Sequence, residues 1–195
     1  MYDPNSIRQV NEAIGNAGRT SHDGRNPTRA ALKAAHLYDT FAMRGLFHRL
    51  WGMMRRRSTR LLSLAEIEKA HAIRSRNYGG ARRVAITQIR GSEGRADAFD
   101  DAFYPRKDTV NHRWINIAAA RYQDVTLPPV ELIQVRDEFY VRDGHHRISV
   151  ARALGERYVD AVVTVWEVDP AFRRAVEATP APQGPVVAQP QPGAR

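Results

Sequence analysis

The sequence contains no cysteine, and this absence excludes disulfide cross-links and thiolate metal sites. It also lacks any apolar run close to the roughly 18 residues that a membrane-spanning helix needs. The first residues, Met1-Tyr2-Asp3-Pro4-Asn5, do not show the basic and then apolar order of a signal peptide. We therefore expect a soluble, cytoplasmic protein with no membrane span.

Acidic residues are scarce in the first part of the chain. The formal net charge of the 195 residues is +9. Residues 1–78 contain 14 Lys and Arg against 6 Asp and Glu, whereas residues 79–195 contain 16 against 15. The basic excess therefore belongs to the N-terminal part, and the two parts are expected to have different partners.

A long helix is predicted from Thr28 to about Arg57. Residues 1–24 have few large apolar side chains, and we expect them to be mobile. Asn26-Pro27-Thr28 suits a helix N-cap followed by proline in the first turn. Apolar residues then recur at helical spacing, at Met43, Phe47, Leu50 and Met54. We expect this stripe to be covered by another part of the protein.

A second helix is predicted to begin at Ser63-Leu64-Ala65-Glu66, which has the pattern of a capping box. We expect it to run to about Arg76, since Asn77-Tyr78-Gly79-Gly80 would end it. Residues 25–78 would then form a basic helical hairpin.

A group of arginines follows the first helix: Arg55, Arg56, Arg57 and Arg60. One interpretation is that these cations only stabilise the helix C-terminus. The other is a basic amphipathic helix that contacts DNA or an anionic membrane surface, with Trp51 and Phe47 as anchors. The sequence leaves both open.

The most informative stretch runs from Phe139 to Gly155. Its first residues are strand formers, Gly144 permits a tight turn, and an apolar-rich helix follows that Gly155 ends. A helix that begins at such a turn directs unpaired N–H groups and its positive dipole end toward an anion. Arg147 adds a guanidinium suited to phosphate. We interpret the turn as a phosphate-binding corner.

The motif Asp143-Gly144-His145-His146-Arg147 resembles the ParB/sulfiredoxin superfamily, over roughly Val84 to Val168. Partition proteins carry Gly-Glu-Arg-Arg at this turn, which cradles nucleotide phosphates, and sulfiredoxins carry Gly-Cys-His-Arg with a catalytic Cys. His145 takes the nucleophile's place here, and the absence of cysteine excludes sulfiredoxin chemistry. The motif is closest to that of bacterial ParB-like proteins and more distantly similar to free serine kinases.

A polar loop, Gly91-Ser92-Glu93-Gly94-Arg95, follows a strand expected from Arg82 to Ile89. The resemblance implies that this loop lines the nucleotide site opposite the glycine turn. Ser92 and Arg95 are then candidate phosphate ligands, and Glu93 joins His145 as a candidate catalytic residue, with Glu93 as a general base. The alternative is an ordinary surface turn.

Each residue of the corner also has a structural interpretation. Asp143 can accept turn N–H groups or cap the helix. His145 and His146 are adjacent on a helix, about 100° apart, so we expect no dedicated transition-metal site there. Mg²⁺ carried by nucleotide phosphates is more plausible. Arg147 can pair with Glu131 or Glu156 instead of a ligand.

The remaining patterns complete an α+β fold, with a small mixed-sheet ParB/sulfiredoxin-like domain at residues 79–177 after the helical extension. A helix is expected to about Gln123, strands at 130–135 and 139–141 form a hairpin, and 158–168 is the last strand. Residues 178–195 form a proline-rich tail that we expect to be disordered.

The resemblance implies a nucleotide-binding protein that takes CTP, ATP or ADP and either hydrolyses the nucleotide or transfers its phosphoryl group. The alternative is a DNA-associated module similar to chromosome-partitioning proteins. Whether the chain forms a homodimer is open.

Overall fold

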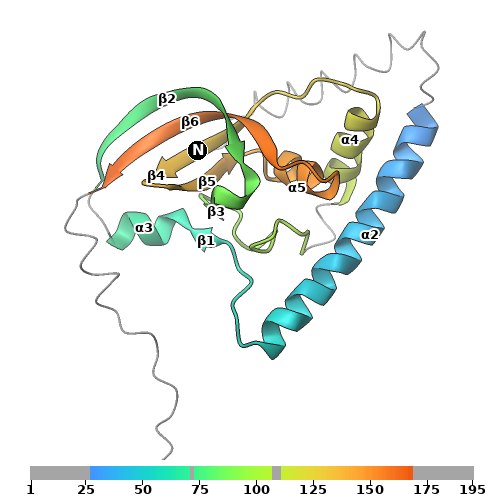
Figure 1. The fold of residues 1–195 in the computed structure, drawn as a ribbon, viewed down its shortest axis with the longest axis horizontal. Helices are drawn as coiled ribbons and strands as arrows, with labels where there is room; N and C mark the ends of the chain where they lie inside the picture. The colour runs from blue at the N-terminus through green and yellow to red at the C-terminus, as the bar shows by residue number, and fades with distance from the viewer. Residues whose placement is uncertain (1–26, 71–72, 107–110, 169–195) are drawn as a thin grey trace, which may run out of the picture.

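The computed structural model describes residues 27–70, 73–106 and 111–168, which form a six-stranded mixed sheet with helices on both faces (Figure 1). The α+β fold expected from the sequence is therefore correct. The predictions for residues 1–24 and 178–195 lie outside the described residues. Among the helices that the structure describes, none is both long and apolar enough to cross a membrane.

The elements follow one another along the chain as α2 (Pro27–Met54), β1 (Leu62–Ser63), α3 (Leu64–Ala70), β2 (Ile73–Ala85), the 3-10 turn η1 (Ile86–Gln88), β3 (Ile89–Ser92), α4 (Asn111–Tyr122), β4 (Val130–Val135), β5 (Glu138–Asp143), α5 (His145–Ala153) and β6 (Tyr158–Val168). In the sheet their order is β1-β3-β5-β4-β6-β2. β1 with β3, β3 with β5, and β4 with β6 are parallel, whereas β4 with β5 and β2 with β6 are antiparallel.

The side chains along the central strands point into two apolar cores, one on each face of the sheet. Val130 and Leu132 of β4 face the larger core, which α2, α4 and α5 cover. Ile133 and Val135 of the same strand face a smaller core that α3 covers through Leu64. β4 is thus buried on both faces, and four of its six residues are apolar and buried.

The larger core includes one face of α2. Tyr38 and Phe41 lie against the buried Trp114 of α4, with ring centroids 5.3 Å and 6.1 Å apart, and Ala34 beside them is fully buried. Gly45 and Gly52 continue this face, close to Tyr104 and Thr59. The long helix is thus a packing element of the domain.

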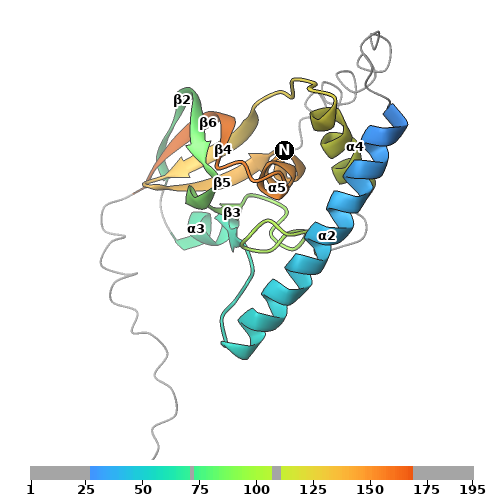
Figure 2. The same ribbon diagram turned by 45° about the vertical axis from the view of Figure 1, so that its right-hand side comes forward.

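The apolar stripe of α2 does not lie where the sequence suggested. The prediction that the stripe would be covered is wrong for the described residues, because Met43, Phe47, Leu50 and Met54 are exposed. Small residues and aromatic rings on the opposite face make the contact with the core instead. Figure 2 shows the C-terminal half of α2 extending past α4 and α5.

The second predicted helix is too long. α3 ends at Ala70, and residues 73–78 form the first part of β2, which pairs with β6. The helical hairpin predicted at residues 25–78 is therefore wrong in its second half. Pairing with β6 gives the backbone N–H and C=O groups of residues 73–78 more hydrogen bonds than a frayed helix end would. The division predicted at residue 79 falls inside β2, at a register shift between Tyr78 and Ala81.

The strand predicted from Arg82 to Ile89 is also divided. β2 ends at Ala85, η1 turns the chain, and β3 begins at Ile89. The hairpin of β4 and β5 and the last strand β6 lie where the sequence placed them. The helix expected to about Gln123 is α4, and its residues Trp114, Ile117 and Ala118 are buried.

Candidate functional site

The predicted glycine turn joins β5 to α5. Gly144 has φ 100° and ψ 20°, a left-handed conformation that side chains other than glycine's rarely tolerate. A Cβ atom here would also lie 2.6 Å from Val130 Cγ1. No side chain caps the helix at this residue. The turn therefore places the first residues of α5, His145 to Arg147, in the interior, where all three are buried.

His145 is joined to the end of β3 by a hydrogen bond. Its Nε2 lies 2.7 Å from Ser92 Oγ, and Phe99 stacks against the ring. The same Oγ accepts the N–H groups of Gly94 and Arg95 at 3.2 Å and 2.9 Å. With both acceptor positions occupied, the hydroxyl proton is left to donate to Nε2. The predicted loop and the predicted turn therefore do meet.

Both imidazoles of the motif are held neutral. Burial, the neighbouring His146 and the positive charge of Arg95 lower the pKa of His145 to about 3. Burial and the charges of Arg113 and Arg95 lower the pKa of His146 to about 3 as well. The same positive field that opposes protonation of these rings attracts an anion.

Arg113 is a member of the site that sequence analysis missed. It lies on the first turn of α4, far from the motif in sequence, and lines one small cavity together with Arg95 and the turn. The cavity measures about 10 Å³, which is room for about one water molecule. A single sequence gives no signal that would bring the start of α4 to this turn.

Arg147 is engaged with its own protein. Its guanidinium donates to the carbonyl oxygens of Pro128 and Pro129 at 2.5 Å and 2.7 Å and to Asp143 Oδ2 at 2.5 Å. The alternative ion pair with Glu131 or Glu156 is wrong in its partner, because the carboxylate that Arg147 meets is Asp143, four residues earlier at the end of β5.

Asp143 therefore supports the corner through Arg147, and Glu156 pairs with Arg121. Arg147 ties the start of α5 to the segment before β4. Its role as a phosphate ligand stays a prediction.

Glu93 lies at the rim of the site. Its Oε2 accepts a hydrogen bond from Arg142 Nε at 3.2 Å, and both side chains are about one-third exposed. A general base needs this carboxylate free for an acceptor. Arg142 engages Oε2 only, and the carboxylate has a second oxygen that can accept a proton, so the role of Glu93 stays a prediction.

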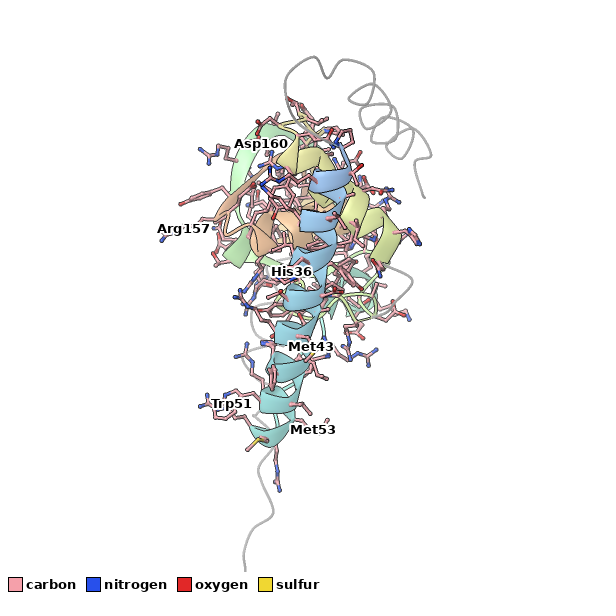
Figure 3. The ribbon with its side chains drawn as sticks, turned by 90° about the vertical axis from the view of Figure 1, so that its right-hand side faces the viewer. His36, Met43, Trp51, Met53, Arg157 and Asp160 are labelled. Carbon is pink, nitrogen blue, oxygen red and sulfur yellow. The ribbon has the colours of Figure 1, made fainter. Side chains whose placement is uncertain are left out.

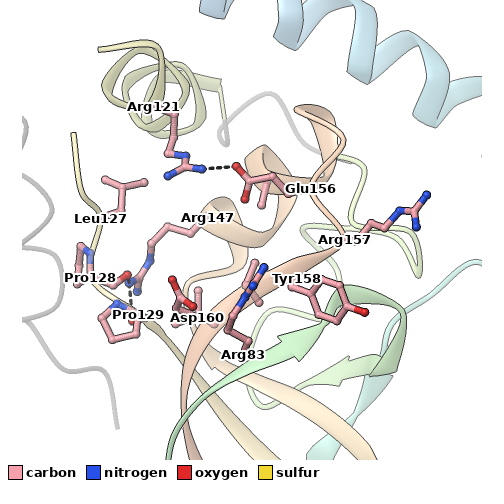
Figure 4. A pocket seen from close by; sticks show the side chains of 13 residues that line it. Arg83, Arg121, Leu127, Pro128, Pro129, Arg147, Glu156, Arg157, Tyr158 and Asp160 are labelled. Atoms are coloured by element: carbon pink, nitrogen blue, oxygen red, sulfur yellow. Dashed lines mark hydrogen bonds and ion pairs between the residues drawn. The ribbon is translucent and has the colours of Figure 1, made fainter. Parts of the chain in front are cut away.

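A larger cavity lies adjacent to the corner and was not predicted. It measures about 570 Å³, within the range of small-molecule sites, and Arg147 forms part of its wall (Figure 4). Its charged lining is mostly basic and comprises Arg83, Arg121, Arg157, Glu156 and Asp160. Arg83 lies over the Tyr158 ring, 5.3 Å from its centroid.

A third cavity, of about 370 Å³, lies beyond the end of α2. Four arginines line it: Arg57 and Arg60 from the segment between α2 and β1, Arg90 from β3 and Arg152 from α5. Two of the predicted nucleic-acid contacts, Arg57 and Arg60, are thus brought together with two arginines that were not predicted. Arg55 and Arg56 do not line the cavity.

One cluster of described residues has the composition of a metal site. His48, Asp100 and Asp101 offer ligand atoms within 4.8 Å of one another, and Asp100 Oδ2 is buried without a hydrogen bond. Arg49 lies 3.7 Å from Asp100 Oδ2, and Arg57 lies 3.4 Å from Asp101 Oδ2. These guanidinium groups already balance the carboxylates, so the cluster fits an ion-pair network better than a divalent cation.

The comparisons with known proteins are sparse. No protein-family profile matches the chain, and no curated protein sequence matches it. The structure is similar to the crystal structure of sulfiredoxin from Arabidopsis thaliana, with 17% sequence identity and a TM-score of 0.31. The match covers 43% of this chain and 82% of that one.

Proposed function

We propose that the protein binds the phosphate groups of a nucleotide at the corner between β3 and α5. The observation that supports this most directly is the convergence of Arg95, Arg113 and the N-terminus of α5 on one cavity. An anion there would meet the positive end of the helix and two guanidinium groups. The neutral imidazoles beside them add hydrogen-bond donors without adding charge.

The ligand enters by displacing side chains. A cavity of about 10 Å³ does not admit a phosphate, so the half-buried Arg95 and Arg113 must swing outward and close on the ligand. A bound phosphate would offset the positive field at the motif and raise the pKa of His145 and His146. Binding should therefore be accompanied by proton uptake at pH values between the free and the bound pKa of these rings.

Calorimetric titration with CTP, ATP and ADP, each with Mg²⁺, tests the proposal. Arg113→Ala and Arg95→Ala each remove a hydrogen bond to a charged group, worth about 1.5–3 kcal/mol, and should weaken binding about 10- to 100-fold. Arg83→Ala is the matched control, because Arg83 lines only the larger cavity. If Arg83→Ala abolishes binding and Arg113→Ala does not, the ligand lies in the larger cavity and the proposal is wrong.

If the protein hydrolyses the nucleotide or transfers its phosphoryl group, Glu93 is the candidate general base for that reaction. Glu93→Gln should then abolish turnover and leave nucleotide affinity within a factor of about 3, because a general base acts on the attacking group. If this variant turns over at the original rate, Glu93 is not the general base and only forms an ion pair with Arg142.

DNA association is a second candidate function, favoured by the four arginines around the cavity beyond α2. Such a cluster suits the phosphates of a nucleic-acid backbone. The logarithm of the binding constant should fall with the logarithm of salt concentration, by roughly 0.9 per phosphate neutralised. Arg60→Ala and Arg152→Ala should each reduce this slope, and an unchanged slope would remove the candidate.

A further inference from the structure

The outward face of the C-terminal half of α2 is an apolar surface. Seven large apolar side chains are exposed on it: Met43, Leu46, Phe47, Leu50, Trp51, Met53 and Met54. Their exposed fractions reach 65% at Phe47 and 76% at Met54. Figure 3 shows Met43, Trp51 and Met53 on the part of the helix that extends away from the sheet. We refer to these seven residues as the α2 patch.

The α2 patch is not a surface that the domain could bury by packing α2 differently. The opposite face of the same turns is already packed, since Gly45 lies against Tyr104 and Gly52 against Thr59. Rotating the helix to bury the patch would expose Phe41 and break its contact with Trp114. Seven exposed large hydrophobic residues on one helix face are uncommon in a soluble monomer and indicate an interaction surface.

The charges around the α2 patch indicate which kind of partner it binds. Residues 43–60 contain six arginines and no Asp or Glu. Arg44 and Arg55 border the patch on one side by helical periodicity, and the Arg55 guanidinium lies 4.8 Å from the Trp51 ring centroid. The N-terminal half of the outward face is mostly polar, with Arg29, His36 and Asp39 exposed beside a single large apolar side chain, Leu32.

We propose that the α2 patch binds an anionic phospholipid surface, with α2 lying in the plane of the membrane interface. An apolar face with Trp and Phe, bordered by arginines such as Arg44 and Arg55, is what interfacial helices present to acidic lipids. A second copy of the chain would bring arginines against arginines, at an electrostatic cost. A nucleic-acid backbone would satisfy the arginines and leave the apolar side chains in water.

Sedimentation of the full chain with vesicles of phosphatidylglycerol or phosphatidylcholine tests the proposal. We expect binding to the anionic vesicles and little binding to the neutral ones. Phe47→Glu and Leu50→Glu should each weaken binding about tenfold or more, because each replaces a lipid-inserted side chain with a charge. Both side chains are exposed, so the fold should be unaffected.

Leu32→Glu is the matched control. Leu32 is 68% exposed on the same outward face, about three helical turns before Met43, and lies outside the patch. Trp51 gives a second signal, because Trp114 and Trp166 are buried and Trp51 is exposed. Its emission should shift to the blue with anionic vesicles, and Trp51→Phe should remove that shift.

Three results would overturn the proposal. The first is no binding to anionic vesicles, and the second is equal loss of binding with Leu32→Glu and Phe47→Glu. The third is a dimer in solution that Phe47→Glu dissociates, because the α2 patch would then be covered by a second copy. Arg55→Gln combined with Arg56→Gln should weaken vesicle binding without changing the oligomeric state.

Discussion

The Ser92 hydroxyl and the His145 imidazole lie 2.7 Å apart, although the two residues are 53 positions apart in the chain. This hydrogen bond connects the polar loop after β3 to the first turn of α5. It is buried, and the same hydroxyl orders the loop by accepting two backbone N–H groups. The loop and the helix are therefore held as one unit around the candidate site.

Ser92→Ala should destabilise the fold by about 1–3 kcal/mol, the cost of leaving buried polar groups without a partner. Urea unfolding measures this. Thr126→Ala, at an exposed residue after α4, is the control and should change the unfolding free energy by less than about 0.5 kcal/mol. A neutral Ser92→Ala would mean that water replaces the hydroxyl and that the loop is not ordered by it.

Stability should fall as the pH is lowered from 7 to 5. His145 and His146 have folded-state pKa values of about 3, below the ordinary value of 6.5, so the unfolded chain takes up protons first. Their contribution is complete above pH 6.5 and is lost as the pH falls toward 3. Each ring accounts for about 2 kcal/mol between pH 7 and 5.

Unfolding free energies at several pH values measure this dependence. His146→Gln should make the pH dependence less steep by about one proton. An unaltered pH dependence in His146→Gln would show that the pKa of His146 is the same in the folded and the unfolded chain, which would contradict the prediction.

Arg147→Ala should cost about 3 kcal/mol of stability, because it leaves the Asp143 carboxylate and two carbonyl groups without their donor. Arg147→Lys should recover part of this, since one ammonium cannot reach all three acceptors as the guanidinium does. Arg157→Ala, at an exposed arginine of the neighbouring cavity, should be close to neutral. If Arg147→Ala keeps full stability and loses nucleotide affinity, Arg147 is a ligand and its intramolecular contacts are secondary.

Gly144→Ala and Gly155→Ala separate backbone strain from steric conflict. Both glycines have positive φ, 100° and 81°, so alanine should cost about 1–2 kcal/mol at either residue. Only at residue 144 does the added Cβ meet Val130, and this should add about 1–3 kcal/mol. Thermal unfolding measures the loss of stability in each variant. Equal losses in the two variants would contradict this expectation.

The parts of the fold that the sequence predicted well are those specified by local patterns. The strand, glycine turn and helix from β5 to α5 follow from strand formers, a residue that tolerates positive φ, and an apolar run. β6 and the hairpin of β4 and β5 were found for the same reason. In each case neighbouring residues alone determine the conformation.

Long-range contacts account for what was missed. The first part of β2 forms because β6 lies beside residues 73–78. No pattern within those residues indicates that they pair with β6. The sequence likewise showed that α2 has apolar residues but not which face the core would take, since small residues at Ala34 and Gly45 allow closer packing than the larger side chains opposite. Arg113 reaches the candidate site only because α4 packs on α5.

The outer strands of the sheet also determine how the protein resists aggregation. β1 is only two residues long, and β2, at the opposite edge, carries exposed arginines at Arg74, Arg76, Arg82 and Arg83 and two register shifts. Short, charged and irregular edges are poor templates for the addition of a strand from another chain. The sheet is thereby protected against edge-to-edge fibril growth, even at concentrations at which the chains meet often.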